Sequence, residues 1–404
     1  MSQWAIIADD LTGALDTALQ FRNAGRRTRV STRDGTWPPD SQTMAMSTAS
    51  RHLGASAAYD AVRGAVGAAA PGALIYKKTD SLLRGNIAAE LQAALDGTDA
   101  ATLVYTPAFP SGGRTTESGT LTLWGTPVSE ADPGRDPVTP ALESHIPTLI
   151  QSTSALTSRV IPTSVVRSGV PALADALREA RDAGVNVILP DIAEDSDLQC
   201  VAAAMDAADL LRVSAGSAGL AAPLARLDET PPQPVPEMSR TTRTLAIIGS
   251  PMEHTQQQLA EAAATLGVKP IPLPQLPGAS IMAAATVRAG WSLDRPALVD
   301  AVIPVKHPSP EAQAAQQALV TQFTGTIWRG TRPIGLVLSG GDTARAAFAA
   351  IPAEAIELAG EIGWGVPYGV FTSGRGEGWP VVTKAGVMGG PTALVDALRA
   401  IGTP

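Results

Sequence analysis

The stretch "ALIYKKTDSLLRGNIAAELQAAL", residues 73–95, combines three patterns that decide the fold. Its first four residues are apolar and favour a buried strand, and its last nine carry apolar residues at helical spacing. The ten residues between them include two lysines, an aspartate and an arginine. A strand that leads through such a loop into a helix is typical of a parallel sheet, in which ligands bind at the carboxyl ends of the strands.

The same alternation of apolar runs and amphipathic segments recurs on both sides of this stretch, as in "WAIIA" at 4–8, "NVILP" at 186–190 and "TLAIIGS" at 244–250. We therefore predict an α/β protein of two domains, each a mostly parallel sheet flanked by helices. A proline-rich, polar segment interrupts the alternation and predicts a stiff linker. The expected division is an N-terminal domain over 1–228, the linker over 229–243 and a C-terminal domain over 244–404.

Composition narrows the function classes. The chain has 404 residues, of which 45% are hydrophobic and 17% charged, and its net charge of -8 is spread along the sequence. A dispersed negative charge argues against a general nucleic-acid binder. Cys200 is the only cysteine, so no intramolecular disulfide forms. The start "MSQWAIIADDLTG" does not have the pattern of a secretion signal, and no run is long and apolar enough to span a membrane. We expect a soluble cytoplasmic protein without a nucleic-acid or membrane partner.

Two adjacent carboxylates follow the first apolar run, in "WAIIADDLTGALDTA". Asp9 and Asp10 could accept a hydroxyl proton, organise a hydrated Mg²⁺ or cap the helix that follows. One aspartate suffices for a cap, and Gly13 allows a close approach of the backbone. The pair therefore favours a ligand site over capping alone.

The charged loop at 77–86 offers cations at the end of a predicted strand. Arg84 presents a fork that matches a carboxylate or phosphate, whereas a lysine acts as a point charge. Successive strand residues point to opposite faces, so we expect only one of Lys77 and Lys78 to enter a site. An internal ion-pair cluster of Lys78, Asp80 and Arg84 is the competing interpretation.

A further cation lies in the loop "TPAFPSGGRTTESGT", residues 106–120. Prolines stiffen this loop and glycines free its backbone, with Arg114 near its centre. Such a loop suits anion capture. A solvated arginine on an ordinary surface loop is the alternative.

Glycine-containing turns between strand and helix recur in the second half, at "GS" (249–250), "SGGDTA" (339–344) and "TKAGVMGG" (383–390). Backbone N–H groups in such turns can bind phosphate oxygens, and a helix N-terminus adds a favourable dipole. Tight turns need glycine for other reasons, and no Walker sequence is present. Because the design recurs, with Lys384 nearby, we predict a nucleotide phosphate site. The four histidines show no metal-ligand spacing, and no metal ligand is assigned.

Together these segments resemble the four-carbon acid sugar kinase family. The matching motifs are "ADDLTGALD" at 8–16, "KKTDSLLRGN" at 77–86, "PAFPSGGRTTESG" at 107–119, "GSAGLA" at 216–221, "GS" at 249–250, "SGGDTA" at 339–344, "GVP" at 365–367 and "TKAG" at 383–386. The resemblance implies an acid-binding N-terminal domain, an ATP-binding C-terminal domain and phosphorylation of threonate, erythronate or a 3-oxo-tetronate. Together with the charge pattern it suggests that the terminal hydroxyl accepts the phosphoryl group and that Mg²⁺ acts with ATP. The nucleotide-binding residues that we predict are Ser250, Gly340, Gly341, Asp342, Thr343, Lys384 and Gly386.

The resemblance and the charge pattern also suggest roles in the first domain. The catalytic candidates are Asp10, Asp80 and Lys78, with either aspartate as the base, and the substrate-binding candidates are Asp9, Lys77, Arg84 and Arg114. A sugar-acid sensor that has lost phosphotransfer is the alternative function. A dinucleotide-dependent oxidoreductase is disfavoured because the first turn reads "ADDLTGA" and not G-x-G-x-x-G. The acid used and assembly into a homo-oligomer are left open.

Overall fold

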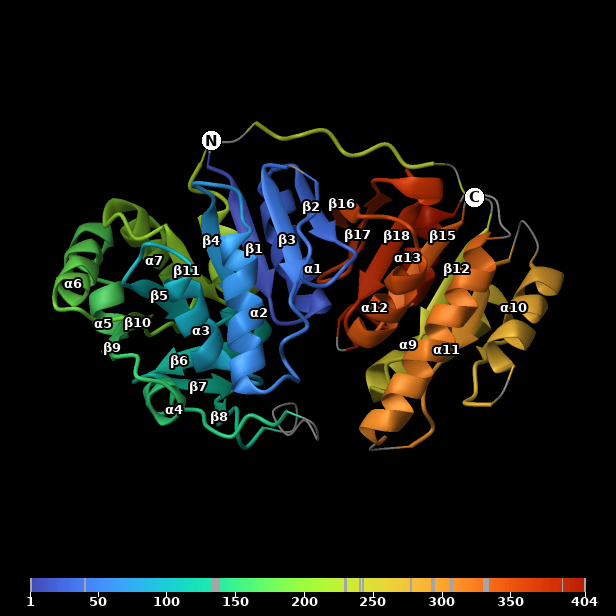
Figure 1. Ribbon diagram of the computed structural model, residues 1–404, viewed down its shortest axis with the longest axis horizontal. Coiled ribbons are helices and arrows are strands. Elements are labelled where there is room, and N and C mark those ends of the chain that lie inside the picture. Colours follow the sequence, from blue (N-terminus) through green and yellow to red (C-terminus); the bar gives the residue numbers. More distant parts are fainter. Residues whose placement is uncertain are drawn as a thin grey trace. The chain divides into compact units, whose positions relative to one another are not determined.

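A computed structural model describes residues 2–39, 41–131, 139–228, 231–239, 241, 243–276, 278–291, 295–305, 308–329, 334–386 and 388–402. The chain divides into two compact units. The first comprises Met1–Thr28 and Asp34–Gln233, and the second comprises Arg29–Arg33 and Pro234–Pro404. Each unit contains a large sheet flanked by helices, which confirms the α/β fold class (Figure 1). Part of the segment 229–243 lies outside the described residues.

The first unit is built on a parallel sheet. Its strands run in the order β3-β1-β4-β11-β5-β10-β9, and each described pairing between neighbours is parallel. Their bounds are β1 Trp4–Ala8, β3 Thr43–Ser47, β4 Leu74–Lys78, β5 Leu103–Thr106, β9 Ser158–Ile161, β10 Val187–Pro190 and β11 Val213–Gly216. The central strands are buried along their whole length, as expected for a sheet covered on both faces.

Helices cover this sheet in two groups. In Figure 1, α2 and α3 pack together, and they contact β1 and β4, respectively. A second group packs in the series α1, α8, α7 and α6. The helices are α1 Leu11–Asn23, α2 Ala55–Gly67, α3 Ile87–Asp96, α4 Ile146–Thr153, α5 Thr163–Val166, α6 Val170–Asp182, α7 Asp195–Ala207 and α8 Ala218–Leu224. A small antiparallel sheet of β6 Arg114–Glu117, β7 Thr120–Leu123 and β8 Thr126–Pro127 follows the short 3₁₀ helix η1 Pro110–Gly112.

The second unit has a mixed sheet in the order β13-β14-β12-β15-β18-β17-β16-β2. The strands from β13 to β18 in this order pair in parallel, and β18, β17, β16 and β2 pair antiparallel. Their bounds are β2 Thr28–Ser31, β12 Thr244–Ile248, β13 Ile271–Pro272, β14 Ala297–Asp300, β15 Gly335–Ser339, β16 Ala355–Glu361, β17 Pro367–Phe371 and β18 Pro380–Lys384. The flanking helices are α9 Glu253–Leu266, α10 Ala279–Gly290, α11 Pro310–Arg329, α12 Gly341–Ala350 and α13 Ala393–Ile401.

Strand β2 reaches the second unit from an early part of the sequence. Val30 pairs with Ile356, and the guanidinium of Arg29 donates to the carboxylate of Glu357 at 2.9 Å. The chain therefore passes between the units three times, after Thr28, after Arg33 and after Gln233. A division of the chain at the proline-rich segment alone therefore leaves β2 in the N-terminal part, although β2 pairs in the sheet of the second unit.

Helix packing in the second unit separates α9 and α13 from the series α10, α11 and α12. Parallel pairing brings the carboxyl ends of β12, β15 and β18 to one edge of this sheet, as it does for β1, β3 and β4 in the first unit. Within the described ranges, no helix is both long and apolar enough to cross a membrane.

Candidate functional site

An arginine and three aspartates form an ion network where β1, β3 and β4 end. The guanidinium of Arg51 donates from Nε to Asp9 Oδ2 at 2.7 Å and from Nη1 to Asp10 Oδ2 at 2.9 Å, and Nη2 lies 3.5 Å from Asp80 Oδ1. The three aspartates were predicted from the sequence as site residues, whereas Arg51 was not. The sequence signal for Arg51 is its place four residues after the apolar run "TMAMS". In the structure that run forms β3, which pairs directly with β1.

The network lowers the pKa of two of its carboxylates, Asp9 and Asp80. Burial by itself raises the pKa of Asp80, but the positive charges of Arg51 and Arg84 outweigh it and hold that pKa well below its usual value. Burial also raises the pKa of Asp9, and the charge of Arg51 lowers it. The net result is a pKa below the usual value. Both carboxylates are therefore ionised at neutral pH, which makes them weak proton acceptors.

Asp10 differs from its two neighbours in exposure. Its side chain is 28% exposed, compared with 2% for Asp9 and 7% for Asp80. Asp10 Oδ1 accepts the backbone N–H of Gly13 at 2.8 Å and caps α1. Capping and a place in the charged network therefore occur together at Asp10.

Arg84 and Asp80 form the paired part of the charged loop. Arg84 donates from Nε to Asp80 Oδ2 and from Nη2 to Asp80 Oδ1, both at 2.8 Å. Asp80 Oδ2 also accepts the backbone N–H of Leu82 at 3.1 Å. Of the ion-pair cluster considered for this loop, Asp80 and Arg84 thus form a pair. This pairing fixes the orientation of the arginine fork.

The side chains of the two lysines at the end of β4 have different partners. Lys77 is fully buried and its Nζ lies 2.8 Å from Glu90 Oε2, while Ser50 donates to the other oxygen of Glu90. Sequence reasoning missed Glu90, which lies on α3. Lys78 is 5% exposed, and its Nζ donates to the carbonyl of Thr79 at 2.6 Å.

Lys78 lies against the start of α1. A Cβ built on Gly13 would lie 2.6 Å from Asp10 Oδ1 and 3.0 Å from Lys78 Nζ, so only glycine fits there without a shift. No carboxylate among the described residues forms an ion pair with Lys78. A buried ammonium with one carbonyl partner is costly unless an anion approaches it.

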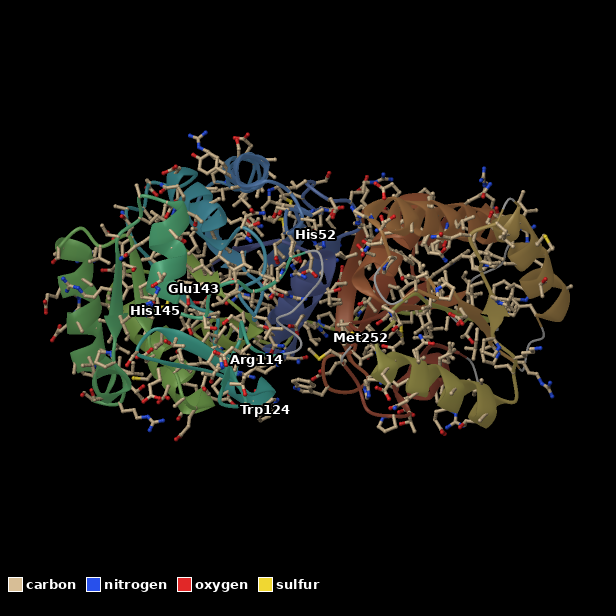
Figure 2. All side chains as sticks on the ribbon, turned by 90° about the horizontal axis from the view of Figure 1, so that it is seen from below. His52, Arg114, Trp124, Glu143, His145 and Met252 are labelled. Carbon is tan, nitrogen blue, oxygen red and sulfur yellow. The ribbon has the colours of Figure 1, made fainter. Side chains whose placement is uncertain are left out.

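Arg114 begins β6, and its Nη1 donates to the carbonyl of Gly112 at 2.5 Å. Its Nε is buried and has no hydrogen-bond partner in the part of the chain that the structure describes. Burial lowers the pKa of Arg114, against the opposing charge of Asp80. Figure 2 labels Arg114 and Trp124, whose ring packs on Gly113. The buried donor of Arg114 points to an anionic or polar ligand.

The predicted nucleotide residues of the second unit gather at the ends of neighbouring strands. A Cβ on Gly249 would lie 2.1 Å from Thr343 Oγ1, and one on Gly386 would lie 2.4 Å from Ser250 Oγ. Gly340, with φ of 108°, donates its N–H to the carbonyl of residue 384 at 2.9 Å. Three turns from β12, β15 and β18 therefore pack closely. The side chain of Asp342, in the first turn of α12, is 61% exposed.

Lys384 ends β18 with its ammonium turned toward carbonyl oxygens. Nζ donates to Ala385 O at 2.9 Å and to Met388 O at 3.2 Å. Burial lowers its pKa to about 8. Within the described ranges it has no carboxylate partner.

The described residues include no group of three or more His, Cys, Asp or Glu arranged to hold an ion. Although Asp9, Asp10 and Asp80 converge, Arg51 occupies the space between them. The structure therefore assigns no protein ligands to Mg²⁺.

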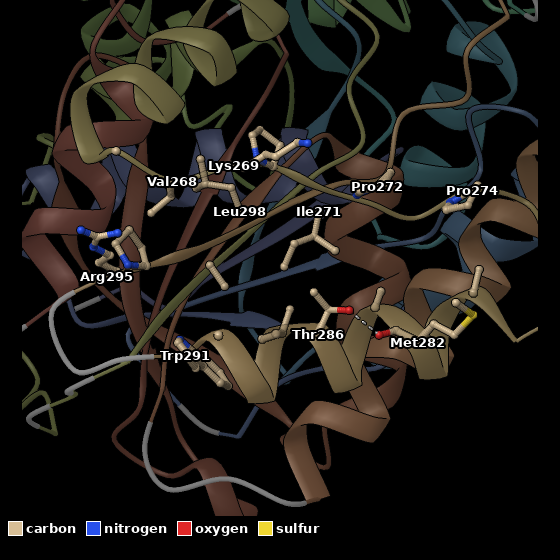
Figure 3. A pocket seen from close by; sticks show the side chains of 18 of the residues that line it. Val268, Lys269, Ile271, Pro272, Pro274, Met282, Thr286, Trp291, Arg295 and Leu298 are labelled. Carbon is tan, nitrogen blue, oxygen red and sulfur yellow. Dashed lines mark hydrogen bonds between the residues drawn. The ribbon is translucent and has the colours of Figure 1, made fainter.

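A cavity of about 690 Å³ lies elsewhere in the second unit, beside α10 (Figure 3). Its wall is mostly apolar and includes Ile271, Val287 and Leu298, with Lys269 and Arg295 among the polar residues. The residues that line it include none of those predicted to bind a nucleotide. The cavity is therefore separate from the glycine turns.

Two family models match most of the chain. Residues 4–224 match a family described as a sugar-binding N-terminal domain, and residues 245–394 match one described as a nucleotide-binding C-terminal domain. These matches fall on the acidic network and on the glycine turns, respectively.

Curated relatives match over nearly the full length. A D-threonate kinase of Bordetella bronchiseptica is 35% identical over 98% of this chain and 96% of its own, and one of Salmonella typhimurium is 30% identical over 97% of each. A D-erythronate kinase of Heliobacterium modesticaldum is 28% identical over 97% of this chain and 95% of its own. A solved structure from Salmonella typhimurium LT2 has the same fold, with a TM-score of 0.84 at 22% identity, and covers 99% of this chain and 100% of its own.

Proposed function

We propose, on the premise that this chain belongs to the four-carbon acid sugar kinase family, that it transfers the γ-phosphoryl group of ATP to the terminal hydroxyl of D-threonate. As a member of that family, the chain is a phosphotransferase that acts on a hydroxyl group of a sugar acid. Similarity to two D-threonate kinases supports this acid as the substrate. The proposal rests most directly on two cationic side chains, the buried Lys78 and the half-buried Arg114 with its buried Nε, that have donors available beside ionised aspartates.

The cations suit the two ends of such a substrate. A guanidinium recognises a carboxylate through paired donors, and the available Nε of Arg114 supports a role in holding the acid group. Arg84 would assist, since Asp80 fixes its fork. Lys78 lies beside the N-terminus of α1, where an ammonium and the helix dipole would stabilise the charge of a phosphoryl group in transfer.

Asp10 is the aspartate that we assign to the substrate hydroxyl. Asp80 has both carboxylate oxygens bonded to Arg84, whereas Asp10 has the most exposed carboxylate of the network. Phosphoryl transfer depends more on orienting the hydroxyl than on a strong base, because its transition state is loose. An aspartate held by Arg51 and by the start of α1 is suited to orienting a hydroxyl. Asp80 would then act by positioning Arg84.

The glycine turns of the second unit would hold the nucleotide phosphates. Backbone N–H groups near Ser250 and in the run from Gly340 to Thr343 lie at the starts of helices, where the dipole favours anions. The close approach of Gly249 to Thr343 and of Gly386 to Ser250 supports a single cradle. Mg²⁺ would arrive with ATP and neutralise phosphate charge.

The direct test is ADP release by the purified chain with ATP, Mg²⁺ and each of D-threonate, L-threonate, D-erythronate, L-erythronate and 3-oxo-tetronates, with glycerate as the control. We expect turnover that is highest with D-threonate. Turnover confined to another four-carbon acid would retain the kinase but replace the substrate. Saturable binding of an acid without ADP release would instead support the sensor function.

A further inference from the structure

The loop that follows Lys384 has its carbonyl groups turned toward the protein interior. Every described carbonyl from Ala385 to Gly390 accepts a hydrogen bond from a side chain. The donors are Lys384 itself and residues of α9. Residue 387 is outside the described part of this loop.

Helix α9 supplies these donors from consecutive turns. Gln258, which is 1% exposed, has its Nε2 at 2.8 Å from Gly390 O and 3.2 Å from Gly389 O. Thr255 donates from Oγ1 to Gly386 O at 2.7 Å, and His254 Nε2 lies 2.8 Å from Gly389 O. The backbone of the loop is therefore held to α9 at both ends.

The opposite side of the same peptide groups carries their N–H groups. The C=O and N–H of a trans peptide point in opposite directions, so inward carbonyls direct the N–H groups of Gly386, Gly389 and Gly390 away from α9. None of these three N–H groups donates to another described residue. Two of these N–H groups belong to adjacent residues, Gly389 and Gly390, and successive backbone N–H groups can form a concavity that binds anions.

We infer that Gln258 and Thr255 are positioning residues that hold residues 385–386 and 388–390 with their free N–H groups available to an anion and so set the affinity for nucleotide phosphate. This inference rests on the proposed nucleotide-binding function of the second unit. Lys384 belongs to the same device, because its ammonium bonds to Ala385 O and Met388 O from inside the loop. In this arrangement the side chains of Gln258 and Thr255 act on the nucleotide through the loop, because their hydrogen bonds go to its carbonyls.

The test uses the full-length chain and isothermal titration calorimetry with MgADP. Gln258→Leu removes the amide donor, and Thr255→Val removes one hydroxyl with little change of shape. Each variant loses at least one hydrogen bond to a loop carbonyl, so we expect the Kd for MgADP to rise about 10-fold in each variant. The KM for the acid should stay within about twofold of wild type, since the acid site lies in the first unit.

Gln257→Leu is the matched control, because Gln257 is exposed on the same helix and bonds to Glu253 instead of the loop. It should leave the Kd for MgADP unchanged. Unchanged affinity in a folded Thr255→Val variant, and in Gln258→Leu where it folds, would overturn the positioning role. A wild-type chain that binds no adenine nucleotide would instead refute the nucleotide assignment of the second unit.

Discussion

Arg51 shows how one residue can define the chemistry of several others. Its guanidinium contacts Asp9, Asp10 and Asp80, which come from two strand ends that lie 70 residues apart in the sequence, and the same contacts keep Asp9 and Asp80 ionised. The charges are partly buried, so each partner depends on the others for stability.

Replacing Arg51 should therefore affect both folding and catalysis. We expect Arg51→Met to lower the free energy of unfolding by about 3 kcal/mol or more, because it leaves buried carboxylates unpaired. Arg51→Lys keeps the charge but loses the fork, and should recover part of that stability. Urea unfolding of both variants measures the effect, and equal stability of wild type and Arg51→Met would contradict the role of the network.

The two candidate bases can be separated by their kinetic signatures. Asp10→Asn should lower kcat about 100-fold with little change in the KM for the acid, because it removes the group that orients the hydroxyl. Asp80→Asn should raise that KM, because Arg84 loses its anchor. Steady-state kinetics of both variants check this, and the reverse pattern would exchange the two roles.

The lowered pKa of Lys384 predicts that the free energy of unfolding depends on pH in the alkaline range. Its pKa is about 8 in the folded chain, compared with 10.5 for an unburied lysine, which applies to the unfolded chain. Between these two pH values the unfolded chain binds a proton that the folded chain does not. The free energy of unfolding contributed by this group therefore rises with pH in that interval. Urea unfolding from pH about 7.5 to about 10.5 should show this rise in wild type relative to Lys384→Met. Parallel curves would argue against the burial of the charge.

At the scale of elements, the parallel strands carry most of what could be predicted. The runs at β1, β4, β12, β15 and β18 are apolar and end in charged or glycine-rich turns, and parallel pairing brings such turns together. Side-chain partners from other segments could not be predicted in this way. Arg51, Glu90 and Gln258 follow no local motif, and their roles depend on contacts with distant residues.

A substitution at Gly13 tests whether the start of α1 belongs to the site. Gly13→Ala places a Cβ against Asp10 Oδ1 and Lys78 Nζ, so we expect a fall in kcat of about 10-fold from displacement of these groups. Gly64→Ala is the control, because Gly64 lies within α2 with open space around it. That substitution should stabilise the chain by about 0.5–1 kcal/mol and leave kcat unchanged. Equal kcat in both variants would remove the start of α1 from the site.

At the scale of the whole molecule, two units with separate cores carry separate groups of functional candidates. The sequence predicted two α/β domains from repeated strand and helix patterns. Such patterns could not show that β2 joins the second sheet, because its partner β16 lies more than 300 residues further along the chain. The ion pair of Arg29 with Glu357 accompanies that pairing.

The reaction that we propose is phosphorylation of D-threonate on its terminal hydroxyl. The most direct measurement is ³¹P NMR of the product formed from D-threonate, ATP and Mg²⁺ by the purified chain. We expect a new phosphomonoester signal, split by coupling to the two protons of the terminal carbon, that appears as the γ-phosphate signal of ATP disappears. Formation of inorganic phosphate alone, or of an ester at another carbon, would contradict it.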